Sequence, residues 1–405
     1  MSLTLPHAYT GVTLRTTVTG ADRPGITSAL LDVLAAAGVV VLDVAQVVLG
    51  GRLVLMALTT APRDERGVTA LRNAVLAWSA DVGLDVRVEQ ASGDNPARPD
   101  GRGIVTVLAQ RLSPADLAAV TGRIADVGGN IDRIGRVARW PVTCLELSVS
   151  GVDPYVLKTM LADLAAGLAI DVAVQAEGLH RRAMRLVVLD VDSTLIRGEV
   201  VDMLADEAGT GAEVAAITEQ AMDGMLDFAA ALRARVALLR GLDIAALQRV
   251  SDRIALTPGA RTFIRTLKVL GYRVGLVSGG FTQLVDPIAA QLGVDFVRAN
   301  TLEIVDGKLT GAVTGGIVDR EGKRAALAEF AAVHGIPLEH TVAIGDGAND
   351  LDMLAAAGLG VAFNAKPAVR AAADAAVSVP YLDSVLYLLG ITPAEVAAVG
   401  GATVS

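Results

Sequence analysis

An apolar run at residues 186–189 leads directly into the motif Asp190-x-Asp192-x-Thr194. A short apolar run that ends in polar turn formers is typical of a strand buried on both faces of a parallel sheet. Side chains two positions apart in an extended chain point the same way, so Asp190 and Asp192 would face one crevice at the carboxyl edge of that sheet. Carboxylates this close repel each other, and a hard cation such as Mg²⁺ would relieve the repulsion.

The same residue types also end strands and cap helices where no chemistry occurs, so this motif alone leaves a purely structural role open. Three further polar segments follow in the chain, and they are Ser278-Gly279-Gly280, Lys323 and Gly345-Asp346-Gly347-Ala348-Asn349-Asp350. Ser278 and Asp346 each follow a strand-like apolar run, so we predict that they reach the same sheet edge as Asp190. There the Ser278 hydroxyl and the Lys323 ammonium would bind phosphate oxygens, and Asp346 would complete a carboxylate cage.

In this order the four segments resemble the motifs of the haloacid dehalogenase superfamily of phosphohydrolases. The second acid, Asp192, is the residue that goes with the phosphatases and phosphomutases of that superfamily. Further matches resemble its phosphoserine phosphatase family, and they cover residues 190–197, Glu199, Met222, Phe228, Arg235 and residues 277–281, 345–350 and 363–367. The resemblance, which spans residues 185–389, implies hydrolysis of O-phospho-L-serine to L-serine and phosphate, the last step of serine biosynthesis.

The resemblance also implies a role for each matched residue. Asp190 would attack phosphorus and become an aspartyl-phosphate, and Asp192, with the higher pKa of the two, would act as general acid and then as general base. Mg²⁺ would be held by the carboxylates of Asp190 and Asp346 and by the main-chain carbonyl of Asp192. Thr194 and Asp350 would support these ligands from behind. The residues that would bind substrate are Glu199, Met222, Phe228, Arg235, Ser278, Gly279, Gly280, Lys323 and Asn349.

Residues 198–256 separate the first two motifs, and this stretch is too long for a simple crossover. Its apolar residues recur at helical spacing, so we predict a small cap of packed helices. Within the cap, the resemblance implies that Glu199 meets the substrate ammonium and Arg235 its carboxylate. Met222 and Phe228 would exclude water from the site, although both could equally be ordinary helical core.

Two related βαββαβ units are predicted before the first motif, at residues 1–92 and 103–177, joined by a polar stretch that contains Gly and Pro. The expected strands of the first unit are residues 12–18, 39–48, 53–58 and 84–88, and its expected helices are residues 26–37 and 68–79. The second unit repeats this pattern. The predicted fold class is α/β, with two ferredoxin-like units before a Rossmann-like core with a parallel sheet at residues 185–390 and a tail at residues 391–405.

The loop at residues 20–26 resembles the ligand loop of ACT domains, which bind small amino acids and commonly pair across subunits. The resemblance implies that L-serine binds near Asp22 and Gly25 and inhibits the enzyme, and that the chain forms a homodimer. A plain strand-to-helix turn, with Asp22 as cap and Pro24 at the first helical position, remains open. The equivalent loop at residues 110–116 has no glycine, so we do not expect the second unit to bind ligand in the same way.

The composition disfavours several other classes of protein. A net charge of −9 argues against nucleic acid or an anionic membrane as the main partner. Hydrophobic residues make up 52% of the chain, but charges interrupt every apolar run before the roughly 18 residues that span a bilayer. The N-terminal residues lack the basic start of a secretion signal, and the single cysteine, Cys144, fits a reducing cytoplasm and inert packing in a strand.

Two other functions stay open at this point. A phosphotransferase or mutase would use the same nucleophile and pass the phosphoryl group to an acceptor other than water. An amino-acid sensor would keep the phosphatase half as an inactive scaffold. The intact set of Asp190, Asp192, Lys323 and Asp346 argues against the sensor, because an inactive domain has no need to hold so many charges together.

Overall fold

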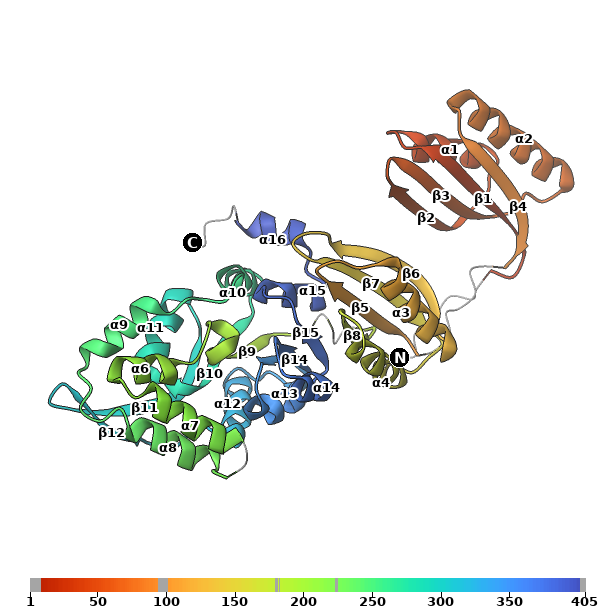
Figure 1. The fold of residues 1–405 in the computed structure, drawn as a ribbon. Coiled ribbons are helices and arrows are strands. Elements are labelled where there is room, and N and C mark those ends of the chain that lie inside the picture. Colours follow the sequence, from red (N-terminus) through yellow and green to blue (C-terminus); the bar gives the residue numbers. More distant parts are fainter. Residues whose placement is uncertain (1–8, 94–100, 179–180, 182, 223–224, 401–405) are drawn as a thin grey trace. The chain divides into compact units, whose positions relative to one another are not determined.

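A computed structural model describes residues 9–93, 101–178, 181, 183–222 and 225–400 of the chain (Figure 1). The chain divides into two compact units, residues 1–98 and residues 99–405. In the part of the chain that the structure describes, no helix combines the length and the apolar character needed to cross a membrane.

The first unit is a four-stranded antiparallel sheet with two helices packed on one face (Figure 1). Its strand order is β2-β3-β1-β4, and Gly50-Gly51 forms the predicted tight turn between β2 and β3. Leu34 and Val75, from the two helices, pack on Val18 in one apolar core. The elements are β1 (Val12–Ala21), α1 (Ile26–Ala36), β2 (Val41–Leu49), β3 (Arg52–Thr60), α2 (Glu65–Val82) and β4 (Asp85–Ser92).

The second unit begins with the same βαββαβ arrangement, as predicted. The strand order of this sheet is β6-β7-β5-β8, and all of its neighbouring strands are antiparallel. Cys144 is fully buried in β7, and burial raises the pKa of its thiol to about 12, which fits the predicted inert packing. The elements are β5 (Gly103–Ala109), α3 (Pro114–Asp126), β6 (Asn130–Ala138), β7 (Thr143–Ser150), α4 (Pro154–Ala166) and β8 (Asp171–Ala176).

The predicted Rossmann-like core follows, with a seven-stranded sheet in the described part of the chain. Its order is β12-β11-β10-β9-β13-β14-β15, and its neighbours are parallel except for the antiparallel pair β11 and β12. This hairpin at the edge was not expected from the sequence. The strands are β9 (Leu186–Asp190), β10 (Arg273–Phe281), β11 (Phe296–Val305), β12 (Lys308–Thr314), β13 (Thr341–Gly345), β14 (Leu359–Phe363) and β15 (Ala375–Val377).

Helices cover both faces of this sheet, which explains the unbroken apolar run before Asp190. Leu186 and Val188 belong to the core on one face, and Val187 and Leu189 belong to the core on the other. Every residue of β9 is therefore buried, and its carboxyl end opens at the sheet edge. The helices around the sheet are α10 (Ala260–Val269), α11 (Thr282–Leu292), α12 (Arg320–Val333), α13 (Leu351–Ala356), α14 (Pro367–Ala372) and α15 (Val385–Leu388).

A cap of four helices in the described chain lies between β9 and α10, as the helical spacing predicted (Figure 1). These helices are α6 (Val200–Ala208), α7 (Gly211–Met222), α8 (Phe228–Ala237) and α9 (Ala245–Arg253). Near the C-terminus, the segment predicted as a tail contains a further helix, α16 (Pro393–Gly400). The cap and the carboxyl ends of β9, β10 and β13 together position the residues of the site.

Candidate active site

The first motif leaves β9 through a sharp turn. Asp190 is the last residue of the strand, and Ser193 adopts a left-handed conformation with φ of 59°, so the chain reverses at once. Asp190 and Asp192 are 3% and 8% exposed. The carboxylate of Asp192 accepts hydrogen bonds from the backbone N–H of Val200 (2.8 Å) and from the hydroxyl of Ser278 (3.0 Å). These bonds fix the second acid beside the first at the mouth of the sheet.

Lys323 is a buried cation that contacts the predicted nucleophile, Asp190. The residue belongs to α12 and is 0% exposed. Its Nζ lies 2.5 Å from Oδ1 of Asp190 and 2.7 Å from Oδ1 of Asp350. Burial opposes the charge of the ammonium, but attraction to Asp190 and Asp350 outweighs it, so the pKa of Lys323 is raised and the residue is a fixed cation.

Burial acts on both acids of the first motif. It raises the pKa of Asp190 well above its ordinary value, and repulsion from Asp350 adds to the effect while Lys323 opposes it. Burial also raises the pKa of Asp192, against the hydrogen bonds from Val200 and Ser278. Both shifts are upward, so the expected order, in which Asp192 has the higher pKa of the two, stays a prediction.

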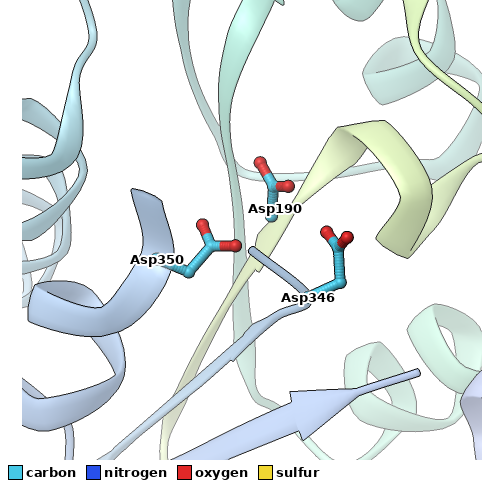
Figure 2. Close-up of side chains that lie close together, drawn as sticks. All are labelled: Asp190, Asp346 and Asp350. Atoms are coloured by element: carbon cyan, nitrogen blue, oxygen red, sulfur yellow. The ribbon is translucent and has the colours of Figure 1, made fainter. Parts of the chain in front are cut away.

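Three carboxylates converge at this edge (Figure 2). Asp190, Asp346 and Asp350 each offer one oxygen atom, and these atoms lie within 4.8 Å of one another. Burial and then repulsion from Asp350 raise the pKa of Asp346 to about 6, although the hydroxyl of Thr194 donates a hydrogen bond to it (3.2 Å). The sequence predicted that Asp350 would support the metal ligands from behind, but its carboxylate is one of the three that converge. The carboxylate of Asp192 points elsewhere, so only its main-chain carbonyl stays a candidate ligand.

The segment Ser278-Gly279-Gly280, predicted as a turn, lies within the end of β10, where the pairing with β11 is irregular, and is tightly packed against the acids. The hydroxyl of Ser278 accepts a hydrogen bond from the N–H of Gly280 (2.8 Å), so this N–H already has a partner. A Cβ at Gly280 would lie 2.6 Å from Val200 and 2.9 Å from Asp192, and only glycine fits there. Gly279 likewise lets the ring of Phe228 approach closely, because a Cβ there would lie 3.1 Å from it.

Asn300 is a supporting residue that sequence reasoning missed. It is 1% exposed in β11, donates to the carbonyl of Gly279 (2.8 Å) and accepts from the backbone N–H of Val318 (2.8 Å). It therefore connects the glycines at the end of β10 to the segment that leads into α12. No motif marks it, because a lone Asn in the middle of a strand carries no spacing signal.

A cavity of about 620 Å³ opens above these groups and is walled by the cap. Of the expected substrate-binding residues it brings together Glu199, Phe228, Arg235, Gly279, Gly280 and Asn349, together with the acids Asp190, Asp192 and Asp346. Ser278 and Lys323 lie beneath its wall, fully buried. Met222 ends α7, and its side chain lies outside the described part of the structure. Asp202 and Lys366 also line the cavity and were not predicted.

The cap supplies charges of both signs to this cavity. Glu199 accepts a hydrogen bond from the hydroxyl of Ser193 (3.1 Å). Burial, and then repulsion from Asp192, raise the pKa of Glu199 to about 7. Arg235 has a buried Nε without a hydrogen-bond partner among the described residues. A buried donor of this kind is costly unless a ligand satisfies it, which suits a binding residue.

The loop of the first unit differs from the plain capped turn considered above. Helix α1 begins at Ile26 after Gly25, which has φ of 92°, and no side chain caps it. Asp22 and Pro24 are therefore neither the cap nor the first helical residue. In the second unit, by contrast, Ser113 and Asp116 form a reciprocal capping box at the start of α3. The helix N–H groups that a ligand would need are thus open in the first unit and occupied in the second.

Three parts of this architecture each match a known protein family. Residues 187–355 match the family model of haloacid dehalogenase-like hydrolases, and residues 13–89 and 103–175 each match an ACT domain. A phosphoserine phosphatase of Streptomyces coelicolor is 58% identical over 95% of this chain and 94% of its own length. One of Mycobacterium tuberculosis is 52% identical over 96% of this chain and 95% of its own.

Among solved structures, an unliganded probable phosphoserine phosphatase of Vibrio cholerae is similar, with 34% identity and a TM-score of 0.55. The alignment covers 73% of this chain and 88% of that one. A hydrolase of Salmonella enterica from the haloacid dehalogenase family aligns over 71% of this chain and 98% of its own, with 28% identity and a TM-score of 0.62.

Proposed function

The chain belongs to the phosphoserine phosphatase family of haloacid dehalogenase-like hydrolases, and from this premise we propose how its residues hydrolyse O-phospho-L-serine. The observation that carries the proposal is the position of Asp190, a buried carboxylate at the end of β9. It lies 2.5 Å from the Lys323 ammonium, at the floor of the cavity that the cap walls. A nucleophile, a fixed cation and a second acid are then all in reach of one phosphoryl group.

The reaction takes two displacements at phosphorus. A carboxylate oxygen of Asp190 attacks phosphorus, the bond to the serine oxygen breaks, and Asp192 gives its proton to that oxygen. Water then attacks the phosphorus of the aspartyl-phosphate, Asp192 takes the proton of this water, and phosphate leaves. Lys323 and Ser278 orient the phosphoryl group. The hydrogen bonds from Val200 and Ser278 hold Asp192 in place for both proton transfers.

The donor set fits a divalent cation, and we propose Mg²⁺. Carboxylate oxygens of Asp190 and Asp346 within 4.8 Å of each other are hard ligands of the kind Mg²⁺ prefers, and the main-chain carbonyl of Asp192 would join them. Asp350 would contribute to the negative field while it stays paired with Lys323. The bound cation would offset the repulsion among the acids and favour the ionised, attacking form of Asp190.

The cap residues suit a zwitterionic substrate. We propose that Glu199 binds the ammonium of phosphoserine and that Arg235 binds its carboxylate, since both line the same cavity and carry opposite charges. Phe228 and Met222 would exclude water when substrate is bound. Asn349 lines the cavity beside the acids and would hold a phosphoryl oxygen.

A panel of phosphorylated metabolites tests this proposal. We expect phosphate release from O-phospho-L-serine far above that from sugar phosphates and nucleotides, because these lack the α-ammonium and α-carboxylate that Glu199 and Arg235 would bind. Chelation with EDTA should stop turnover, and added Mg²⁺ should restore it. Turnover that persists in EDTA contradicts the cation, and equal rates on all substrates contradict the assigned cap residues.

For regulation we propose that L-serine binds the loop of the first ACT domain and inhibits the enzyme. Gly25 and the uncapped start of α1 leave backbone N–H groups free for a carboxylate. Asp22 is exposed in the same loop, and its carboxylate has no partner among the described residues, so it is available to an ammonium. The capping box of the second ACT domain already fills the equivalent positions.

Asp22→Ala should raise the serine concentration for half-inhibition by about tenfold or more, the loss expected for one charge-assisted hydrogen bond. Turnover without serine should not change. Asp81→Ala, an exposed substitution of the same kind on α2, is the matched control. Gly25→Ala is less informative, because alanine would strain the backbone at φ of 92° with or without a ligand. Unchanged serine inhibition in Asp22→Ala places the effector elsewhere.

We also propose that the chain is a homodimer that pairs through β2. This strand lies at the edge of its sheet, and its valines and Leu49 are exposed, with Val47 at 62% and Leu49 at 76%. An exposed apolar edge strand is a template for pairing with a second copy. Val47→Lys should therefore convert the dimer to monomers in sedimentation experiments. Val333→Lys, at a similarly exposed valine of α12, should leave it dimeric, and a monomeric parent chain contradicts the proposal.

A further inference from the structure

Helix α14 joins the catalytic cavity to the second ACT domain. Lys366, directly before the helix, and Val369 within it line the cavity. Arg370, the next residue, reaches Asp171 of β8 in the second ACT domain at 3.2 Å. One short helix therefore has the cavity at its start and a contact with the regulatory half of the chain one turn later.

The carboxylate of Asp171 is buried, and its charge depends on the hydrogen bonds that it accepts. Asp171 is 3% exposed and accepts hydrogen bonds from the backbone N–H of Ser378 (2.6 Å), the hydroxyl of Ser378 (2.8 Å) and Arg370. All of these donors belong to the catalytic domain. Since a buried carboxylate is costly without its partners, this group holds Arg370 and Ser378 in one arrangement.

A second contact fixes the other end of α14. Asp374, just after the helix, accepts from the N–H of Gly360 in β14 (2.8 Å) and from Nζ of Lys158 in α4 of the ACT domain (2.5 Å). Residues from both sides of this boundary, such as Cys144 and Tyr387, belong to one hydrophobic cluster. The second ACT domain is thus part of the support on which α14 rests.

The residues that line the cavity carry more negative than positive charge, which points to a function for Lys366. Five carboxylates line the cavity, from Asp190, Asp192, Glu199, Asp202 and Asp346, whereas its lining cations are Arg235 and Lys366. The ammonium of Lys366 has no ion pair or hydrogen bond within the described residues. A phosphate ester that enters so acidic a cavity is repelled before it reaches Lys323 beneath the floor, and a free cation on the wall offsets that repulsion.

We propose that Lys366 is a substrate-binding cation of this cavity and that the second ACT domain holds it in position through α14, with Asp171 as the positioning residue. The proposal rests on the hydrolysis at Asp190 described above. It gives the second ACT domain, whose own ligand loop is closed by a capping box, a direct structural role in substrate binding.

The kinetics of Lys366→Gln test whether Lys366 binds substrate. We expect KM for phosphoserine to rise about three- to tenfold while kcat changes less than about twofold, because an attracting charge acts on binding rather than on chemistry. The dependence of kcat/KM on ionic strength should become shallower, and Lys366→Arg should restore most of the affinity. Lys308→Gln, on the exposed β12, is the control. An unchanged KM, or a fall in kcat without a rise in KM, overturns the proposal.

A double-mutant cycle tests whether Asp171 positions Lys366. Asp171→Ala should raise KM for phosphoserine by about threefold, and it should add nothing in a Lys366→Gln background, because the cation that it positions is gone. Asp163→Ala, on the exposed face of α4, is the matched control. Additive effects, or an unchanged KM, overturn the positioning role. If Asp171→Ala does not fold, Ser378→Ala removes one of its hydrogen bonds and takes its place in the cycle.

These outcomes are distinct from failure of the proposed mechanism. A chain that lacked phosphoserine hydrolysis would show no turnover in any of these variants or in the parent. The proposal for Lys366 and Asp171 instead predicts full kcat with altered KM.

Discussion

Asp190→Asn is expected to lower kcat on O-phospho-L-serine by about four orders of magnitude or more. Asparagine keeps the shape of the side chain, but its neutral amide cannot attack phosphorus. The fold should survive, because the substitution removes one of several buried carboxylates and leaves Lys323 its 2.7 Å ion pair with Asp350. Phosphate release and thermal unfolding, measured beside the parent, check both parts. Substantial residual turnover would remove Asp190 from the nucleophile role.

The companion variant Asp192→Asn separates the two acids. It keeps the nucleophile, and the leaving group of p-nitrophenyl phosphate departs without a proton. We therefore expect a stoichiometric burst of p-nitrophenolate followed by a stall, since no base activates water for the second displacement. Asp190→Asn should show no burst at all. A burst from Asp190→Asn, or steady turnover of phosphoserine by Asp192→Asn, contradicts the assignment of roles.

Lys323→Met is expected to affect both stability and activity. Lys323 is 0% exposed and is paired with Asp190 at 2.5 Å and Asp350 at 2.7 Å. Removing one partner of a buried ion pair leaves the other charge uncompensated, which costs about 3–5 kcal/mol of the free energy of unfolding. Loss of a preorganised cation at the phosphoryl group should also lower kcat by about 10²- to 10³-fold. Chemical denaturation and phosphate release measure the two effects.

The loss of stability in Lys323→Met should grow with pH. Without the ammonium, the pKa of Asp190, already raised well above its ordinary value, rises further. Above about pH 4, the ordinary pKa of an aspartate, the native state then holds a proton that the unfolded state releases. The free energy of unfolding therefore falls as pH rises and recovers as pH drops. Lys308→Met on the exposed β12 should show neither change, and a pH-independent loss would contradict this reasoning.

Much of the site could be predicted because its residues follow strands. Asp190, Ser278 and Asp346 each come after an apolar run, and parallel strands open their carboxyl ends at one edge, so the structure brings these residues together. The cap was equally readable, since its apolar residues recur at helical spacing. Gly50-Gly51 located the hairpin of the first ACT domain for the same local reason.

Where a local pattern has two solutions, only the structure could decide between them. Asp22 and Pro24 looked like the start of a helix, but α1 begins at Ile26 with Gly25 in a left-handed conformation. Beside burial, repulsion from Asp350 raises the pKa of Asp190, and Asp350 comes from a segment 160 positions further along the chain. Spacing along the sequence contains no information of that kind.

The sequence by itself determined the elements, the cap and the order of charged residues, because apolar periodicity and turn chemistry act over a few neighbouring positions. Only the tertiary structure decided that Asn300 contacts the glycines at the end of β10, that Lys366 lines the cavity and that Asp171 pairs with Arg370 of α14. Asp171 and Ser378 are 207 positions apart. Such contacts form when whole domains bury apolar surface against each other, and the polar groups trapped at the boundary must then find partners.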